Sequence, residues 1–172
     1  MSYADAAGRH NRDSQHPMAI EIERKFRVTS SDWKQSVVRQ RSIRQAYLTK
    51  NGRISIRIRI NNDRRATLTM KTSQPSRRRK EFEYDIPIAD AEELLELREG
   101  AVIEKIRYDV PVGDLTWEVD VFAGENSGLL IAEVELGHED QAVELPSWVG
   151  EEITHDQRFY NADLARRPYQ SW

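Results

Sequence analysis

Two glutamates and a lysine stand on one side of an alternating stretch near the N-terminus. Apolar and charged residues take turns over residues 20–28, which is typical of a strand. Glu21, Glu23, Lys25 and Arg27 therefore share one face, with Glu21 and Glu23 about 7 Å apart. Two carboxylates beside an ammonium on a rigid element could hold a divalent cation and a phosphate together.

The alternation of apolar and charged residues recurs along most of the chain. We expect further strands at residues 43–48, 53–60, 66–71, 79–86, 103–110, 114–122 and 130–136. Asn51-Gly52 marks a hairpin turn, and short turns separate most of the other segments, which favours an antiparallel meander.

The charges on these strands are sorted by type. Acids occur as the pairs Glu21/Glu23, Glu118/Asp120 and Glu133/Glu135, and bases occur as Arg57/Arg59, Lys71 and Lys105/Arg107. An open sheet with its polar face in water would also give alternating strands, but such a face normally mixes residue types. Arginine, which suits phosphate recognition, dominates the central strand. Closing the sheet would turn the charged face inward and leave an apolar exterior covered by helices.

A charged lumen needs a charged occupant, because unpaired buried charge is costly. The acids suit Mg²⁺ or Mn²⁺, and the bases suit an anion of several phosphates. We therefore expect phosphoryl transfer or cleavage, in which cationic groups neutralise the charge of the phosphate oxygens.

The remaining segments are expected to be helices, turns and an irregular N-terminus. Residues 1–17 lack periodicity and are predicted to be a disordered leader, followed by a single domain over residues 18–172. Helices are predicted at residues 33–38, 90–97, 138–143 and 158–165, the second of them capped by Asp90 and ended before Gly100. Residues 72–78 are predicted to form a loop.

The composition narrows the class of protein. The 172 residues contain no cysteine, which removes thiol catalysis and Cys-ligated zinc, and 32% of them are charged although the net charge is only -3. No apolar run is long enough for a membrane span or a signal peptide, so we expect a cytoplasmic protein without a membrane partner. The basic run at residues 77–80 is short, and a phosphate-guiding loop suits it better than a nucleic-acid contact. The oligomeric state is not indicated.

The stretch Glu21-Ile22-Glu23-Arg24-Lys25 resembles the ExExK signature of the CYTH superfamily, the triphosphate tunnel metalloenzymes. The resemblance spans residues 19–165 and includes blocks at residues 45–48, 57–59, 69–71, 79–81, 104–108, 118–122 and 132–135. It implies an α+β fold, mainly antiparallel β, in which a closed eight-stranded barrel forms the tunnel and helices pack on the outside. The segment 154–161 resembles the closing segment of the family, whose helix plugs one tunnel mouth.

The resemblance also implies roles for individual residues. The metal ligands would come from Glu21, Glu23, Glu133 and Glu135, with Asp120 and Glu81 behind them. The triphosphate would contact Lys25, Arg57, Arg59, Lys71, Arg79, Lys105 and Arg107, and Arg158 could reach it from the closing segment. Lys25 and Tyr47 match a catalytic dyad proposed for thiamine triphosphatases of the superfamily.

The leading hypothesis is a triphosphatase, dependent on Mg²⁺ or Mn²⁺, that hydrolyses inorganic triphosphate or a related small-molecule triphosphate. A class IV adenylate cyclase, which shares the tunnel and the metal acids, is the alternative within the enzymes. A module that binds polyphosphate without turnover is the alternative from another class.

Overall fold

The computed structural model describes residues 22–50, 54–72, 81–138 and 140–172, without the side chains of Lys50, Thr72 and Glu81. The predicted leader at residues 1–17 lies outside the described residues. No helix in these ranges is both long enough and apolar enough to cross a membrane.

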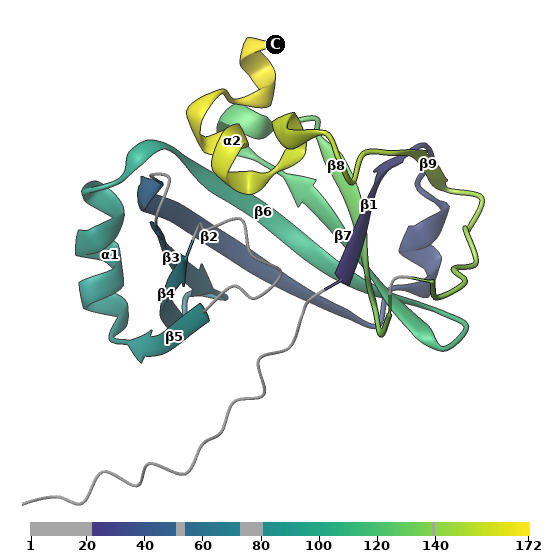
Figure 1. Ribbon diagram of the computed structural model, residues 1–172, viewed down its shortest axis with the longest axis horizontal. Coiled ribbons are helices and arrows are strands. Elements are labelled where there is room, and N and C mark those ends of the chain that lie inside the picture. Colours follow the sequence, from purple (N-terminus) through teal and green to yellow (C-terminus); the bar gives the residue numbers. More distant parts are fainter. Residues whose placement is uncertain (1–21, 51–53, 73–80, 139) are drawn as a thin grey trace, which may run out of the picture.

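The strands form one antiparallel sheet that curves strongly around one face (Figure 1). Nine strands pair in the order β5-β4-β3-β2-β6-β7-β8-β1-β9 within the described residues. Their bounds are β1 (Ile22–Val28), β2 (Arg39–Lys50), β3 (Ile54–Asn61), β4 (Arg65–Thr72), β5 (Glu81–Ile86), β6 (Glu99–Val112), β7 (Leu115–Phe122), β8 (Leu130–Leu136) and β9 (Val149–Glu152). The antiparallel architecture predicted from alternation is confirmed, and β9 is an additional strand of four residues that carries no alternation of its own.

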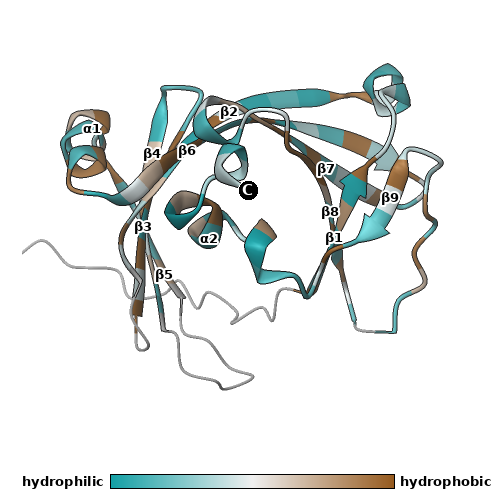
Figure 2. Cartoon of the chain, turned by 90° about the horizontal axis from the view of Figure 1, so that it is seen from above, coloured by the Kyte–Doolittle hydropathy of each residue, from teal (hydrophilic) through white to brown (hydrophobic). Residues whose placement is uncertain are grey.

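The barrel is not closed by strand pairing in the part of the chain that the structure describes. The ladder ends at β5 on one side and at β9 on the other. The sheet still bends far enough to surround the C-terminal segment, as Figure 2 shows for α2 (Asn161–Arg166). The predicted closed eight-stranded barrel is therefore observed as a curved nine-stranded sheet.

The helices differ from the predicted ones at their ends. The helix predicted at residues 90–97 is α1 (Ile88–Glu96), whose N-cap is Pro87, so Asp90 lies in its first turn instead of capping it. The helix predicted at residues 33–38 is a 3₁₀ turn at Asp32–Ser36. The helix predicted at residues 158–165 is interrupted at Tyr160, with a 3₁₀ turn before it and α2 after it.

The prediction of a helix at residues 138–143 is wrong, since the described residues of this stretch form only a turn. Gln141 donates its backbone N–H to the carbonyl of His138 at 3.1 Å, and its side chain accepts a hydrogen bond from the Gly137 N–H at 2.7 Å. A segment this short gains a helix only by packing an apolar face, and this one offers little to pack.

The convex face of the sheet carries the apolar residues, as alternation predicted. Under α1, Ile58 and Ile60 of β3 pack with Ala91 and Leu95 of the helix. At the other end of the sheet a separate cluster surrounds the fully buried Trp117 and includes Phe26, Trp33, Trp148 and Val134. These two clusters fix the direction of the curvature, because they place the charged residues of the same strands on the concave face.

One end of the concave face is apolar, which the sequence did not predict. Leu164 and Ala165 of α2 pack against Ile103, Phe122 and Ile131, which share their face with the charged residues of β6, β7 and β8. The helix therefore covers one end of the concave face, and the charged part is confined to the rest.

The docking of α2 depends on a glycine at the start of β6. Gly100 has φ +77°, and a Cβ at this position would overlap the carbonyl oxygen of Ala165. We expect Gly100→Ala to lower the free energy of unfolding by more than about 2 kcal/mol, because both the backbone conformation and the contact with α2 are lost. Urea unfolding measures this difference.

Gly113→Ala is the matched control. Gly113 also has a positive φ, +58°, but the nearest atom to a Cβ there is the Glu144 carboxylate at 4.0 Å. The free energy of unfolding of Gly113→Ala should fall by only about 1 kcal/mol, because only the backbone conformation becomes unfavourable. Equal losses in the two variants would contradict the role given to the contact with α2.

Candidate active site

A cavity of about 910 Å³ opens on the concave face. Charged side chains from β1, β3, β4, β5, β6, β7 and β8 line it together with residues of the C-terminal segment. The charged residues of the lining are Glu23, Lys25, Arg57, Arg59, Lys71, Glu83, Arg107, Glu118, Glu133, Glu135 and Asp163.

A chain of ion pairs crosses one wall of this cavity. The Lys25 ammonium lies 2.9 Å from Glu23 and 2.6 Å from Glu133, and Arg107 lies 2.6 Å from the other carboxylate oxygen of Glu133. Arg107 also forms an ion pair of 2.6 Å with Asp120, which in turn lies 2.5 Å from Lys105. These six residues carry three positive and three negative charges, and Glu118, which pairs with Arg107, and Glu135 add further negative charge to the same wall.

Strand register explains why these partners meet. Lys25 of β1 lies directly opposite Glu133 of β8, and Arg107 of β6 lies directly opposite Asp120 of β7. Side chains at directly opposed positions are the nearest neighbours across an antiparallel pair. Lys25 and Arg107 therefore each have a carboxylate as a cross-strand partner, whereas Lys105 lies opposite Phe122 and meets Asp120 diagonally.

Lys105 and Asp120 lie beneath the cavity, not on it. Both side chains have 0% exposure, and neither belongs to the lining. Lys105 also donates a hydrogen bond of 3.3 Å to Asn161 of α2. Burial lowers the pKa of Lys105 to about 8 in spite of its contact with Asp120.

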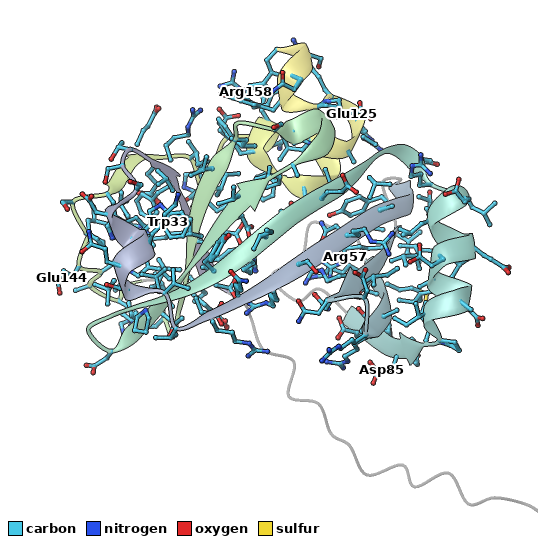
Figure 3. The ribbon with its side chains drawn as sticks, turned by 180° about the vertical axis from the view of Figure 1, so that it is seen from behind. Trp33, Arg57, Asp85, Glu125, Glu144 and Arg158 are labelled. Carbon is cyan, nitrogen blue, oxygen red and sulfur yellow. The ribbon has the colours of Figure 1, made fainter. Side chains whose placement is uncertain are left out.

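The opposite wall, built by β2, β3 and β4, carries arginines without acidic partners. Arg59 lies opposite Gln45 on one side and Thr67 on the other, and Arg57 lies opposite Tyr47 and Thr69. Among the described residues, no carboxylate forms an ion pair with Arg57 or Arg59. Figure 3 shows Arg57 within the curve of the strands.

Neutral groups take the place of carboxylates on this wall. The Arg59 Nε donates to the side-chain oxygen of Gln45 at 2.9 Å, and the Arg57 Nη2 donates to the Thr69 hydroxyl at 3.2 Å. Burial, with Arg57 and Arg107 adding repulsion, lowers the pKa of Arg59 to about 10, so it keeps its charge at neutral pH. Two guanidinium groups held this way form a site for an anion.

Lys25 and Tyr47, the predicted catalytic pair, both line the cavity. Burial lowers the pKa of Lys25, but the ion pairs with Glu133 and Glu23 raise it by more, so its net direction is upward. Burial raises the pKa of Tyr47. Both groups are therefore protonated at neutral pH, and both can donate a hydrogen bond to an anion in the cavity.

The predicted metal ligands differ in how many of their carboxylate oxygens already bind a lysine or an arginine. Glu133 uses one oxygen for Lys25 and the other for Arg107, and Asp120 uses both of its oxygens for Lys105 and Arg107. Glu135 forms no ion pair among the described residues. It is exposed to the cavity, and its backbone lies directly opposite Glu23.

Glu23 and Glu135 are therefore the described carboxylates best placed for a cation. The hard oxygen donors fit Mg²⁺ or Mn²⁺ in chemical type. No group of three His, Asp or Glu side chains poised to hold a metal occurs in the described ranges. Glu21 lies outside those ranges, and the side chain of Glu81 is not described.

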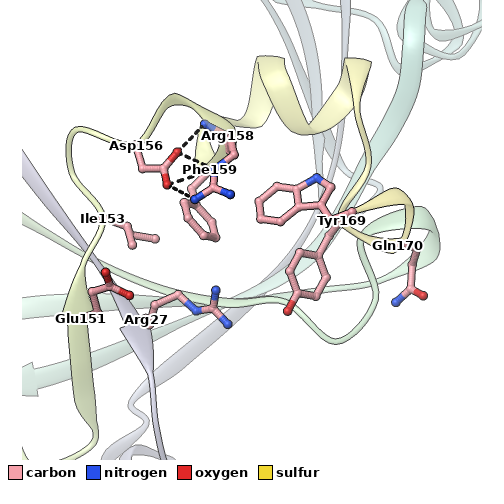
Figure 4. A pocket seen from close by; sticks show the side chains of 9 residues that line it. Arg27, Glu151, Ile153, Asp156, Arg158, Phe159, Tyr169 and Gln170 are labelled. Atoms are coloured by element: carbon pink, nitrogen blue, oxygen red, sulfur yellow. Dashed lines mark hydrogen bonds and ion pairs between the residues drawn. The ribbon is translucent and has the colours of Figure 1, made fainter.

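Arg158 lies outside the cavity. It pairs with Asp156 at 2.6 Å and stacks over Phe159 and Trp172, in a separate pocket of about 520 Å³ beside Arg27 (Figure 4). Lys71 lines the cavity as predicted, whereas Arg79 lies outside the described residues.

Several residues of the site were not predicted to belong to it. Gln45 and Thr69 fall in the family-like blocks 45–48 and 69–71 but were given no role there, and Glu83 falls in none of these blocks. Each shares its strand face with a predicted residue, and this shared face was the available signal. His155, Gln157, Tyr160, Asn161 and Asp163 reach the cavity from the C-terminal segment. Their position depends on how that segment docks, which alternation does not report.

Comparison with known proteins places this site in a family. The CYTH domain profile matches residues 19–169. The chain belongs to the CYTH domain family. An inorganic triphosphatase of Acetivibrio thermocellus is 42% identical over 156 residues, which cover 90% of this chain and 99% of that protein. An inorganic triphosphatase of Nitrosomonas europaea is 40% identical over 150 residues, which cover 84% and 96%.

A solved structure agrees with the assignment to the CYTH family. The crystal structure of an inorganic triphosphatase matches with a TM-score of 0.69 at 37% identity, covering 87% of this chain and 96% of that one. The resemblance inferred from the ordered sequence blocks is thereby confirmed for the family and for the antiparallel fold.

The ion pairs of Glu133 predict how stability depends on pH. Burial raises the pKa of Glu133, but Arg107, Lys105 and Lys25 lower it by more, so the folded value lies well below the ordinary one. The carboxylate therefore stabilises the fold fully above its unfolded pKa of about 4.3, and this contribution is lost progressively as the pH falls from that value through the lower folded pKa. We expect Glu133→Gln to lower the free energy of unfolding by about 3 kcal/mol at pH 7, and by an amount that begins to shrink below about pH 4.3.

Glu135→Gln is the control for this prediction, because Glu135 lies on the same strand without an ion pair among the described residues. Urea unfolding of the three proteins between pH 3 and pH 7 supplies the measurement. A difference between wild type and Glu133→Gln that stays constant over this range would contradict the assignment.

Proposed function

We propose that this CYTH protein is a divalent-metal-dependent triphosphatase that hydrolyses inorganic triphosphate to orthophosphate and pyrophosphate. The observation that carries the proposal is the pair Arg57 and Arg59, which face the cavity with neutral partners while Lys25 and Arg107 on the opposite wall are paired with acids. The identity to relatives named inorganic triphosphatase supports the choice of substrate.

The two walls suggest how the substrate lies. The phosphate oxygens would bind Arg57 and Arg59, with Lys71 on the same wall. Glu23 and Glu135 would hold Mg²⁺ or Mn²⁺ on the other wall, completed by Glu21 as the resemblance implies. The cation, when bound, would neutralise charge on the phosphate oxygens. The charged face would in this way enclose the triphosphate as a tunnel does.

Hydrolysis requires water to attack the terminal phosphorus while the bridging P–O bond breaks. Lys25 and Tyr47 are protonated at neutral pH, so their proposed role is to donate hydrogen bonds to the charge that develops on phosphate, not to accept a proton. Arg107 is hydrogen-bonded to Glu133 and Asp120 and so stabilises this wall. It would have to rearrange these bonds to contact the phosphate, which Arg57 and Arg59 would not.

Product analysis tests the proposed activity against the alternatives. The purified protein is incubated with inorganic triphosphate or ATP, in the presence of Mg²⁺, Mn²⁺ or a chelator. We expect metal-dependent release of orthophosphate from inorganic triphosphate, faster than from ATP. Cyclic AMP and pyrophosphate from ATP would instead indicate an adenylate cyclase, and tight binding without turnover under all conditions would indicate a binding module.

Substitution of a β3 arginine tests the anion site. Arg59→Ala should raise KM for inorganic triphosphate at least about tenfold, since a hydrogen bond to a charged group contributes roughly 1.5–3 kcal/mol. Arg44→Ala is the control, because Arg44 lies on the convex face and pairs with Glu92 and Asp63. An equal change of KM in the two variants would place the substrate elsewhere.

The carboxylate pair makes a separate prediction about the cation. Glu135→Gln should raise the Mn²⁺ concentration needed for half-maximal binding by about tenfold or more, measured by electron paramagnetic resonance of free Mn²⁺, because one anionic oxygen ligand is lost. Glu125→Gln, at an exposed position in the 3₁₀ turn between β7 and β8 and outside the cavity lining, should leave Mn²⁺ binding unchanged. If Glu135→Gln bound Mn²⁺ as the wild type does, Glu135 would not be a ligand of the cation.

A further inference from the structure

Gln45 is a fully buried polar residue of β2 that lies outside the cavity lining. Its exposure is 0%, and its backbone lies directly opposite Arg59. We infer that Gln45 is a positioning residue, which orients the Arg59 guanidinium toward the cavity while leaving its charge available to the substrate. This inference rests on the proposed function and deepens it.

The hydrogen bonds of Gln45 determine which nitrogens of Arg59 are left for the substrate. The Arg59 Nε–H can only donate, so it is the amide oxygen of Gln45 that faces it, at 2.9 Å. The amide nitrogen then points toward the Tyr47 hydroxyl, 3.5 Å away. Because the bond uses Nε, it does not occupy the two terminal nitrogens of Arg59, which are the ones suited to a bidentate phosphate contact.

The contrast with Arg107 shows why an amide matters at this position. Both arginines face a polar side chain directly across the strand, but Arg107 faces Asp120, which accepts two of its hydrogen bonds and cancels its charge. A carboxylate at position 45 would have the same effect on Arg59. An amide supplies the same acceptor geometry without a charge, so it holds the guanidinium and keeps the site cationic.

The neighbouring arginine is held in a comparable way. The Thr69 hydroxyl accepts from Arg57 and donates to Glu83 at 3.1 Å, so a neutral group lies between this guanidinium and the Glu83 carboxylate. Neutral hydrogen-bonding partners behind both arginines of β3 indicate that the wall is arranged to bind a strongly anionic ligand.

Two substitutions separate the charge of residue 45 from its hydrogen bond. Q45E keeps an acceptor in place but adds a negative charge, and we expect it to raise KM for inorganic triphosphate at least about tenfold with an unchanged or higher midpoint of thermal unfolding. Q45M removes the acceptor and adds no charge. It should raise KM by only about threefold and lower the unfolding midpoint, because Arg59 Nε is left without its partner.

The double variant Q45E/R59A tests whether Gln45 acts through Arg59. If it does, Q45E should change KM less than about twofold in the R59A background, because the group it would neutralise is absent. A full tenfold effect in that background, or a KM of Q45E within about twofold of wild type, would overturn the inference. Should Q45E fail to fold, a wild-type KM for Q45M would overturn it instead.

Failure of the proposed function would be visible separately. If the wild-type protein binds inorganic triphosphate without hydrolysing it, the enzymatic proposal fails. The role of Gln45 is then tested by calorimetric Kd values for the same variants, which should change by the factors expected for KM. Wild-type hydrolysis with an unaffected Q45E would overturn the role of Gln45 alone. Absence of both hydrolysis and binding in the wild type would overturn both.

Discussion

Ionised side chains that are removed from water must be paired, because an isolated buried charge costs several kcal/mol. This constraint governs the concave face of the sheet. The chain from Glu23 through Lys25, Glu133, Arg107 and Asp120 to Lys105 meets it by alternating charge at every contact. Cross-strand register supplies the partners, so the antiparallel ladder and the electrostatics of the cavity are one arrangement.

The cations of that wall already have acidic partners, so the arginines of the other wall are the ones available to an anion. If every cation of the lining were paired with an acid, the cavity would have little reason to bind an anion. Arg57 and Arg59 break the pattern because tyrosine, threonine and glutamine stand opposite them. The convex face supports this division from behind, since Ile58 and Ile60 anchor β3 under α1 and keep its arginines turned inward. At the apolar end, α2 shields the concave face from water, which strengthens the remaining electrostatic interactions.

Alternation in the sequence was enough to predict eight of the nine strands seen in the described residues, their antiparallel arrangement and which residues share the charged face. It could not predict register, and register decides that Lys105 and Asp120 are sealed beneath the lining while Gln45 reaches Arg59. The place of Arg158 also escaped prediction, because a nearby acid, Asp156, and the aromatic rings of Phe159 and Trp172 hold it in a separate pocket. Similarly, β9 and the course of residues 140–148 depend on tertiary packing more than on local pattern.

The division of the cavity into a wall whose cations are paired with acids and a wall whose arginines are not is most directly tested by diffraction from crystals soaked with Mn²⁺ and inorganic triphosphate. Anomalous scattering would locate the cation independently of the phosphate. We predict an anomalous peak beside Glu23 and Glu135 and phosphate oxygens in contact with Arg57 and Arg59. A triphosphate bound to Arg107 or Arg158, with Arg57 and Arg59 making no contact to it, would contradict this account.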